Sequence, residues 1–251
     1  MNRKKTILGV LLIVPGLIGI ASLLTMEIPL PAEAEAILKD TYTPEQIKLL
    51  SLVNPTIMLL GAIVVGTILY QRVHLQVPFI EKAAGIRSEI NFTEILMNGI
   101  LGGILAGLLL VVVNVTFNPV IPAEFKEFGT SLQPTLAARF LYGGITEEIL
   151  IRFGVMTLIV WTCSKIFGGT QPIVYWLGII VSAIIFALGH LPVAYQAVAN
   201  PPVGLLTYII IGNSIGGVIF GWLYPKKGLE CARIAHIYDH IILVTVLPVL
   251  S

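Results

Sequence analysis

Seven apolar stretches, each about as long as a membrane-spanning helix, constrain the fold of this chain more than any other feature. They run roughly over residues 6–25, 52–72, 94–117, 132–163, 172–190, 203–224 and 229–250. About 20 apolar residues in a helix, at 1.5 Å per residue, cross the roughly 30 Å hydrocarbon core of a bilayer. Only 12% of the residues are charged, against about 25% in an average globular domain. We therefore expect an all-α, polytopic transmembrane helix bundle with about seven spans, within a range of six to eight.

The fourth apolar stretch is long enough to be divided. Gly143 and Gly144 stand just before Thr146, and glycine is a frequent site of helix breaks and kinks. We expect residues 132–142 to form a separate interfacial helix that leads into a spanning helix over residues 146–163.

The N-terminus has two interpretations. Arg3, Lys4 and Lys5 precede the first apolar run and an alanine-rich segment, 32–36, follows it, as in a signal peptide with its cleavage site. Secretory apolar regions span only about 7–15 residues, and this run is nearer to a full span. We therefore favour an uncleaved first helix with the N-terminus in the cytoplasm.

The distribution of basic residues agrees with that orientation. Alternation through seven spans leaves Lys39, Lys48, Lys126 and Arg139 outside and Arg152 within a span. The other Lys and Arg residues all fall on the cytoplasmic side, as the positive-inside rule requires. They are Arg3, Lys4, Lys5, Arg72, Lys82, Arg87, Lys165, Lys226, Lys227 and Arg233.

The chain is expected to form one integral domain whose two parts differ in content. Residues 1–130 supply transmembrane helices without a recognised motif, and residues 131–251 carry the unusual polar residues. Thr43 and Pro44 have the signature of a helix start that leads into the second span. Glycines in the third and sixth spans predict close helix contacts.

Ionisable residues inside the later spans indicate a functional site. A charged side chain at the bilayer centre costs about 2.5–3.5 kcal/mol, so such residues usually pair within the bundle and often mark function. The residues of this kind are Glu147, Glu148, Arg152, His190, His236, Asp239 and His240.

The spacing of these residues divides them into groups. Glu148 and Arg152 stand four residues apart, which favours an ion pair on one helix face. Glu147 then points about 100° away in an α-helix and stays free to face another partner. His236 and His240 share a face for the same reason. One carboxylate and three imidazoles from different helices can converge around a water or a metal.

Three motifs taken together resemble those of the CPBP family, which comprises CAAX-processing type II endopeptidases and bacteriocin-immunity-related (Abi-like) intramembrane proteases. They are Glu147-Glu148 with Arg152, Phe186 with His190, and His236 with His240, in the family's order over roughly residues 142–240. The last position is commonly Asn in the family, whereas this chain has His240 preceded by Asp239. An imidazole can donate a hydrogen bond as an amide does, but it can also accept a proton or bind a metal.

The resemblance implies an intramembrane endopeptidase and a role for each motif residue. Glu147 would be the general base that activates water, and His190 would help to position that water. His236, with His240, would stabilise the oxyanion. Arg152 would hold Glu148 and so the geometry that presents Glu147, while Phe186 and Asp239 would be supporting residues.

The cofactor requirement stays open between two versions of this chemistry. The family includes proteins described as metalloproteases and as metal-independent glutamate-type proteases, and Glu147, His190, His236 and His240 could ligate Zn²⁺. The soluble zinc-protease signature H-E-x-x-H is absent from the sequence, so we expect no obligatory cofactor.

The expected partners are a peptide or protein substrate, membrane-associated or lipidated, and the lipid bilayer. A formal net charge of +1 gives no indication of nucleic-acid binding. By resemblance, the protein belongs in the plasma membrane of a bacterium. Two other functions fit: a non-catalytic immunity or scaffold protein that binds a peptide, and an ion-coupled carrier. The carrier is disfavoured because the sequence has no inverted repeat.

Overall fold

The described part of the chain is entirely helical in its regular structure. The computed structural model describes residues 3–26, 37–38, 40–87, 89–132 and 134–250. Seven helices in these ranges are long and apolar enough to cross a membrane, which confirms the expected transmembrane bundle. The segment 32–36 that resembles a cleavage site lies outside the described residues.

The spans are built from helices that often continue into a short second element. The first is α1 (Arg3–Ser22) with η1 (Leu23–Thr25), the second α3 (Pro44–Ser51), α4 (Val53–Leu69) and η2 (Tyr70–Val73), and the third α6 (Phe92–Phe117) with η3 (Asn118–Val120). The fourth is η4 (Ala138–Glu147), η5 (Ile149–Met156) and α8 (Thr157–Ile166), and the fifth is α9 (Pro172–Gly189) with α10 (Leu191–Ala197). The sixth is α11 (Val203–Lys227) and the seventh α12 (Leu229–Leu250), while α5 (Pro78–Ala83) and α7 (Ala123–Leu132) are short connecting helices.

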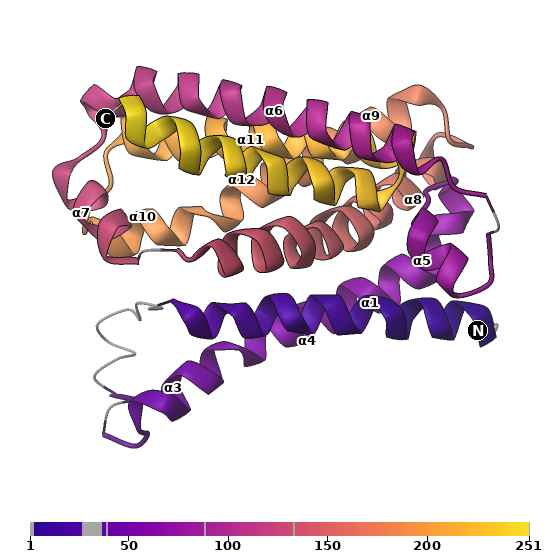
Figure 1. Ribbon diagram of the computed structural model, residues 1–251, viewed down its shortest axis with the longest axis horizontal. Helices are drawn as coiled ribbons and strands as arrows, with labels where there is room; N and C mark the ends of the chain where they lie inside the picture. Colours follow the sequence, from indigo (N-terminus) through magenta and orange to yellow (C-terminus); the bar gives the residue numbers. More distant parts are fainter. Residues whose placement is uncertain (1–2, 27–36, 39, 88, 133, 251) are drawn as a thin grey trace.

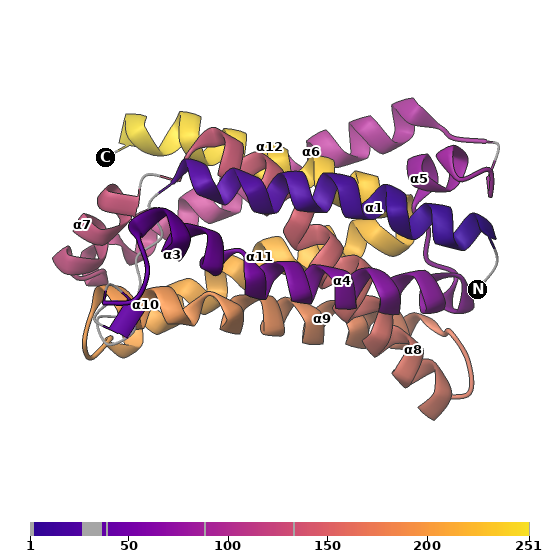
Figure 2. The same ribbon diagram turned by 90° about the horizontal axis from the view of Figure 1, so that it is seen from below.

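The fourth span lies in the middle of the bundle. Figure 1 shows η4 and η5 between α1 and α4 on one side and α12 with α11 on the other, and the turned view in Figure 2 shows α1 and α4 covering this helix. Packing contacts join α1 to η4, α4 to η5 and α12 to η4. Half of the apolar segment of the fourth span is buried inside the protein, the largest share among the seven spans. The polar motif residues of this span are therefore shielded from lipid.

The expectation of a separate interfacial helix over residues 132–142 is wrong. The helix that begins near Ala138 continues without interruption to Ile166. Over Ala138–Glu147 and Ile149–Met156 it is a wide π-helix, a form that is rare and often found at functional sites. Gly143 and Gly144 are buried points of contact with α12 instead of a break. A break would leave backbone groups without hydrogen bonds in hydrocarbon.

The expected helix start after Thr43 is confirmed. The Thr43 hydroxyl accepts a hydrogen bond from the backbone N–H of Gln46, and the Gln46 side chain accepts one from the backbone N–H of Thr43. Pro44 occupies the first turn, and α3 leads directly into α4.

The glycine-rich faces make close helix contacts, as the sequence predicts. A Cβ atom at Gly103 of α6 would overlap the carbonyl oxygen of Ala235 in α12, and one at Gly217 of α11 would lie 2.7 Å from the Cβ of Ala183 in α9. The absence of a side chain therefore lets these backbones approach each other closely.

Candidate active site

The motif residues from three helices meet around one cavity near the end of the bundle that carries α7 and α10. Glu147 ends η4, His190 lies at the junction of α9 and α10, and His236 and His240 lie on successive turns of α12. All four line a cavity of about 450 Å³, together with Phe186 and Asp239. The structure therefore brings together all four residues expected to be catalytic.

Glu147 and Glu148 lie in different surroundings although they are adjacent. Glu147 is half-buried and lines the cavity, whereas the Glu148 side chain is fully buried. The two carboxylates therefore face different surroundings, as expected. The difference is that Glu147 lies in a π-helix, whereas the expected separation of 100° applies to an α-helix.

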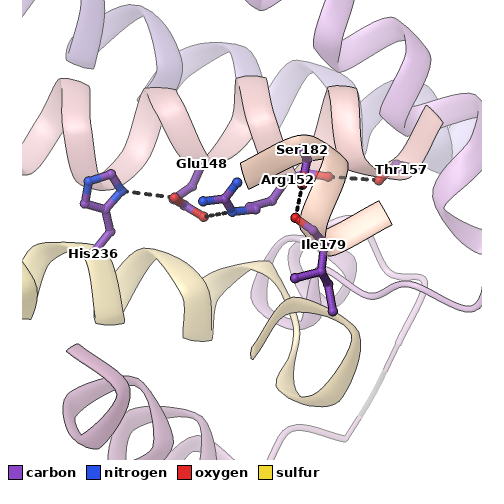
Figure 3. A network of polar contacts seen from close by, with 6 residues as sticks. All are labelled: Glu148, Arg152, Thr157, Ile179, Ser182 and His236. Atoms are coloured by element: carbon purple, nitrogen blue, oxygen red, sulfur yellow. Dashed lines mark hydrogen bonds and ion pairs between the residues drawn. The ribbon is translucent and has the colours of Figure 1, made fainter. Parts of the chain in front are cut away.

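Glu148 joins two of the motifs directly. One of its oxygens lies 3.2 Å from Nε of Arg152, and the other accepts a hydrogen bond from Nδ1 of His236 at 3.0 Å, as Figure 3 shows. The expected ion pair with Arg152 is confirmed. The contact with His236 gives Glu148 a second role, because it orients an imidazole on a helix 88 residues further along the chain. With Nδ1 held in this way, Nε2 of His236 is left for the cavity.

The side chain of Arg152 packs between Glu148 of its own helix and Phe186 of α9. It is fully buried, lies 5.5 Å from the centre of the Phe186 ring, and its backbone carbonyl accepts a hydrogen bond from Thr157. Figure 3 also shows Ser182 donating to the carbonyl of Ile179 on the neighbouring α9. Arg152 is therefore a structural partner of Glu148 and lies away from the cavity lining.

Aromatic contacts fix the two imidazoles that flank Phe186. The Phe186 ring is nearly perpendicular to His190 at 4.6 Å and to His236 at 6.1 Å between centres. Phe220 of α11 stacks on the His236 ring with 4.6 Å between centres. Stacked and edge-on ring pairs at these distances are favourable, so both imidazoles have little freedom to rotate.

The protonation pattern of neutral His190 follows from its contacts. Its Nδ1 lies 2.8 Å from the carbonyl oxygen of Phe186. A carbonyl only accepts hydrogen bonds, so Nδ1 carries the proton and Nε2 has a free lone pair. That nitrogen can accept a hydrogen bond from a water in the cavity.

His240 and Asp239 are the least satisfied members of the site. His240 stacks on His236 at 5.0 Å, and its buried Nδ1 has no hydrogen-bond partner among the described residues. Asp239 is only 3% exposed, and one of its carboxylate oxygens also lacks a described partner. Both side chains therefore have hydrogen-bonding capacity that the described residues do not use.

Several residues of the site were not predicted as functional from the sequence. Phe220, Asn213, Arg139 and Tyr142 line the cavity. Gly143 lies against the imidazoles, since a Cβ added there would be 2.7 Å from Nε2 of His240 and 3.8 Å from Nε2 of His236. Gly143 stands four residues before Glu147, which is only a weak sequence signal for this contact. The helix that packs against Gly143 is known only from the structure.

The residues considered for zinc do not form a metal site in this arrangement. In the part of the chain that the structure describes, no three His, Cys, Asp or Glu side chains are grouped closely enough to hold a metal ion. We therefore derive no step that passes through a metal.

The fold and the site define an integral membrane protein with seven candidate spans and a buried glutamate–histidine site. Residues 130–242 match the family model described as Rce1-like, type II CAAX prenyl endopeptidase. The chain therefore carries an Rce1-like domain, in agreement with the CPBP resemblance of the three motifs. This match supports a CAAX-type intramembrane endopeptidase in general, and so a membrane-bound protease. No curated protein and no solved structure gave a significant match.

Proposed function

We propose that the protein is an intramembrane endopeptidase that hydrolyses a peptide bond with a water activated by Glu147. The proposal rests on the different contacts of the two adjacent glutamates. Glu148 is paired with Arg152 and His236, whereas Glu147 lines the cavity together with His190, His236 and His240. Glu147 is thus the carboxylate available to react.

In the proposed reaction, Glu147 removes one proton from water, and the water's other O–H donates a hydrogen bond to Nε2 of His190. The resulting hydroxide attacks the carbonyl carbon of the scissile peptide bond. Glu147 then transfers the proton to the leaving nitrogen, so the carboxylate is regenerated in each cycle.

His236, as an imidazolium that donates through Nδ1 to Glu148 and through Nε2 into the cavity, and His240 are proposed to stabilise the negative oxygen of the tetrahedral intermediate. Donors that are held rigidly toward developing charge are effective in a site with little bulk water. Glu148 and the stacked ring of Phe220 hold His236 in this orientation. His240 would replace the usual Asn as a second donor through Nε2.

The proposed substrate is a peptide or protein segment that reaches the cavity from the membrane. The cavity is lined by apolar side chains as well as by the reactive residues, which suits a membrane-associated or lipidated chain. The family name indicates prenylated substrates, and we include these among the candidates to be tested.

The experiment compares wild type with Glu147→Gln on a quenched fluorescent peptide library in detergent. We expect cleavage by wild type and a loss of at least about 10³-fold in the variant, because removal of the base leaves only binding and oxyanion stabilisation. Glu124→Gln on α7 is the matched control and should cleave normally, since Glu124 is exposed and does not line the cavity. Full activity of Glu147→Gln would contradict the proposal.

A metal requirement is tested in the same assay. We propose that no metal is obligatory, so wild-type cleavage should persist after treatment with a chelator. Loss of activity with the chelator and its recovery with Zn²⁺ would instead make His190, His236 and His240 ligand candidates. If well-assembled wild type cleaves no peptide, a non-catalytic peptide-binding protein becomes the better description.

A further inference from the structure

Arg139 is a cation beside the site that the proposed reaction does not use. It lies at the start of η4, is half-buried, and lines the 450 Å³ cavity together with His190 and Asn213. The same three residues line a second cavity of about 560 Å³. Arg139 therefore stands at the boundary between the reactive residues and a larger adjoining space.

The hydrogen-bonding capacity of Arg139 is largely unused. Its Nε donates to the carbonyl of Pro134 at 3.1 Å, which anchors the side chain. Within the described ranges, no carboxylate forms an ion pair with it. No described residue accepts a hydrogen bond from Nη1 or Nη2, and their planar arrangement suits the two oxygens of a carboxylate.

The location of Arg139 differs from that of an arginine that only anchors a helix. Near the end of a span, a long basic side chain usually extends toward the lipid headgroups. Arg139 instead lines two cavities among α6, α11 and α12. A cation that lines two cavities without a described anionic partner is positioned to bind the anion of a ligand.

The larger cavity shows what else such a ligand must contain. Its lining is mainly apolar side chains of α6 and α12, including Leu110, Val113, Leu243 and Leu247. The ligand that fits combines apolar side chains with a single carboxylate near His190.

We propose that Arg139 binds a carboxylate of the peptide substrate while the 560 Å³ cavity holds the apolar side chains next to it. This inference rests on the proposed function, because the bound peptide is taken to be the one that is hydrolysed. Arg139 is then a specificity residue that sets the position of the scissile bond by holding the substrate from one side.

The test uses two fluorescent apolar peptides that are identical except that one ends in a carboxylate and the other in a carboxamide. Binding is measured with full-length protein carrying Glu147→Gln, so that neither peptide is consumed. We expect the carboxylate peptide to bind about tenfold more tightly, as for a charge-assisted hydrogen bond. Adding Arg139→Gln should reduce this preference to less than about twofold, and Arg139→Lys should restore part of it.

One control variant and one kinetic measurement separate a specific effect of Arg139 from a general effect of charge or folding. Lys126→Gln removes one positive charge from α7. Lys126 lines neither cavity, so this variant should keep the tenfold preference. Cleavage by the Glu147-containing protein should show the preference in KM, and Arg139→Gln should raise KM for the carboxylate peptide toward that of the carboxamide peptide.

The outcomes distinguish this inference from the proposed function. Equal binding of the two peptides, or binding of neither, overturns the role of Arg139, even if Glu147-dependent cleavage is found. A preference that depends on Arg139 without any cleavage would support the anion site and contradict the peptidase. If Arg139 instead holds a lipid phosphate, both peptides bind alike, and phosphatidylglycerol nanodiscs stabilise wild type more than Arg139→Gln; that result also overturns the proposal.

Discussion

At the scale of single residues, the adjacent Glu147 and Glu148 show how surroundings assign different tasks to the same side chain. Glu148 lies between a guanidinium and an imidazole in a site without exposure to solvent. Glu147 has the cavity on one side. Substitution of the two glutamates should therefore affect different properties of the protein.

Glu148→Gln should destabilise the protein, because it leaves the buried Arg152 without its counter-charge. Removal of one partner of a buried ion pair typically costs about 3–5 kcal/mol. We expect a clear fall in the midpoint of unfolding in detergent, with loss of activity. Glu147→Gln should change the unfolding free energy by less than about 1 kcal/mol, and an equal loss in both variants would refute the assigned difference.

Gly143→Ala should reduce activity more than stability. The added methyl would lie 2.7 Å from Nε2 of His240 and push that imidazole away. Displacements of about 1 Å in an active site can cost about 10²-fold in rate, so we expect a fall of roughly tenfold to a hundredfold in kcat/KM. Gly129→Ala on α7, where a methyl meets no atom within 4 Å, is the control and should be fully active.

At the scale of helices, the position of α12 depends on its packing against the glycines of α6. These two helices share the most extensive contact of any pair of described elements. Because α12 carries His236 and His240, a change in this contact moves two members of the site at once.

Gly103→Ala in α6 tests this dependence. The new methyl would overlap the Ala235 carbonyl and the Tyr238 side chain, so the helices must separate. Overpacking of this kind costs about 1–3 kcal/mol, and we expect lower thermal stability together with lower activity. Gly61→Ala in α4 is the matched control, since its methyl meets nothing within 4 Å and alanine favours the helix. Unchanged stability of Gly103→Ala would argue against close packing here.

At the scale of the whole molecule, the basic residues are divided between the two ends of the bundle. The chain begins at the end that holds α5 and the end of α8, and finishes at the opposite end near α7 and α10, as Figure 1 shows. If the positive-inside rule holds, α7 and the site's end of the bundle face away from the cytoplasm.

Cysteine labelling would test this orientation. In a variant lacking Cys163 and Cys231, Gly129→Cys on α7 should react with a membrane-impermeant maleimide in intact cells. Lys82→Cys on α5 should react only after permeabilisation. Both positions are exposed, so accessibility itself is matched. The reverse pattern would place the N-terminus outside and the site's end toward the cytoplasm.

The membrane architecture followed from the sequence because the hydrocarbon thickness demands long apolar runs, and seven of them were visible without any knowledge of their packing. The pairing of Glu148 with Arg152 also followed, because residues four apart share a helix face whatever surrounds the helix. The three motifs similarly indicated the protease family, and the match over residues 130–242 agrees with it.

Contacts between helices could be read only from the tertiary structure. The link between Glu148 and His236, the position of Gly143 against two imidazoles, and the place of Arg139 between two cavities all depend on helix rotation and separation. The uninterrupted fourth span also depended on packing, because its glycines are used for contact with α12. Local spacing along a chain determines which residues share a face, whereas the partner of that face is decided by the packed bundle.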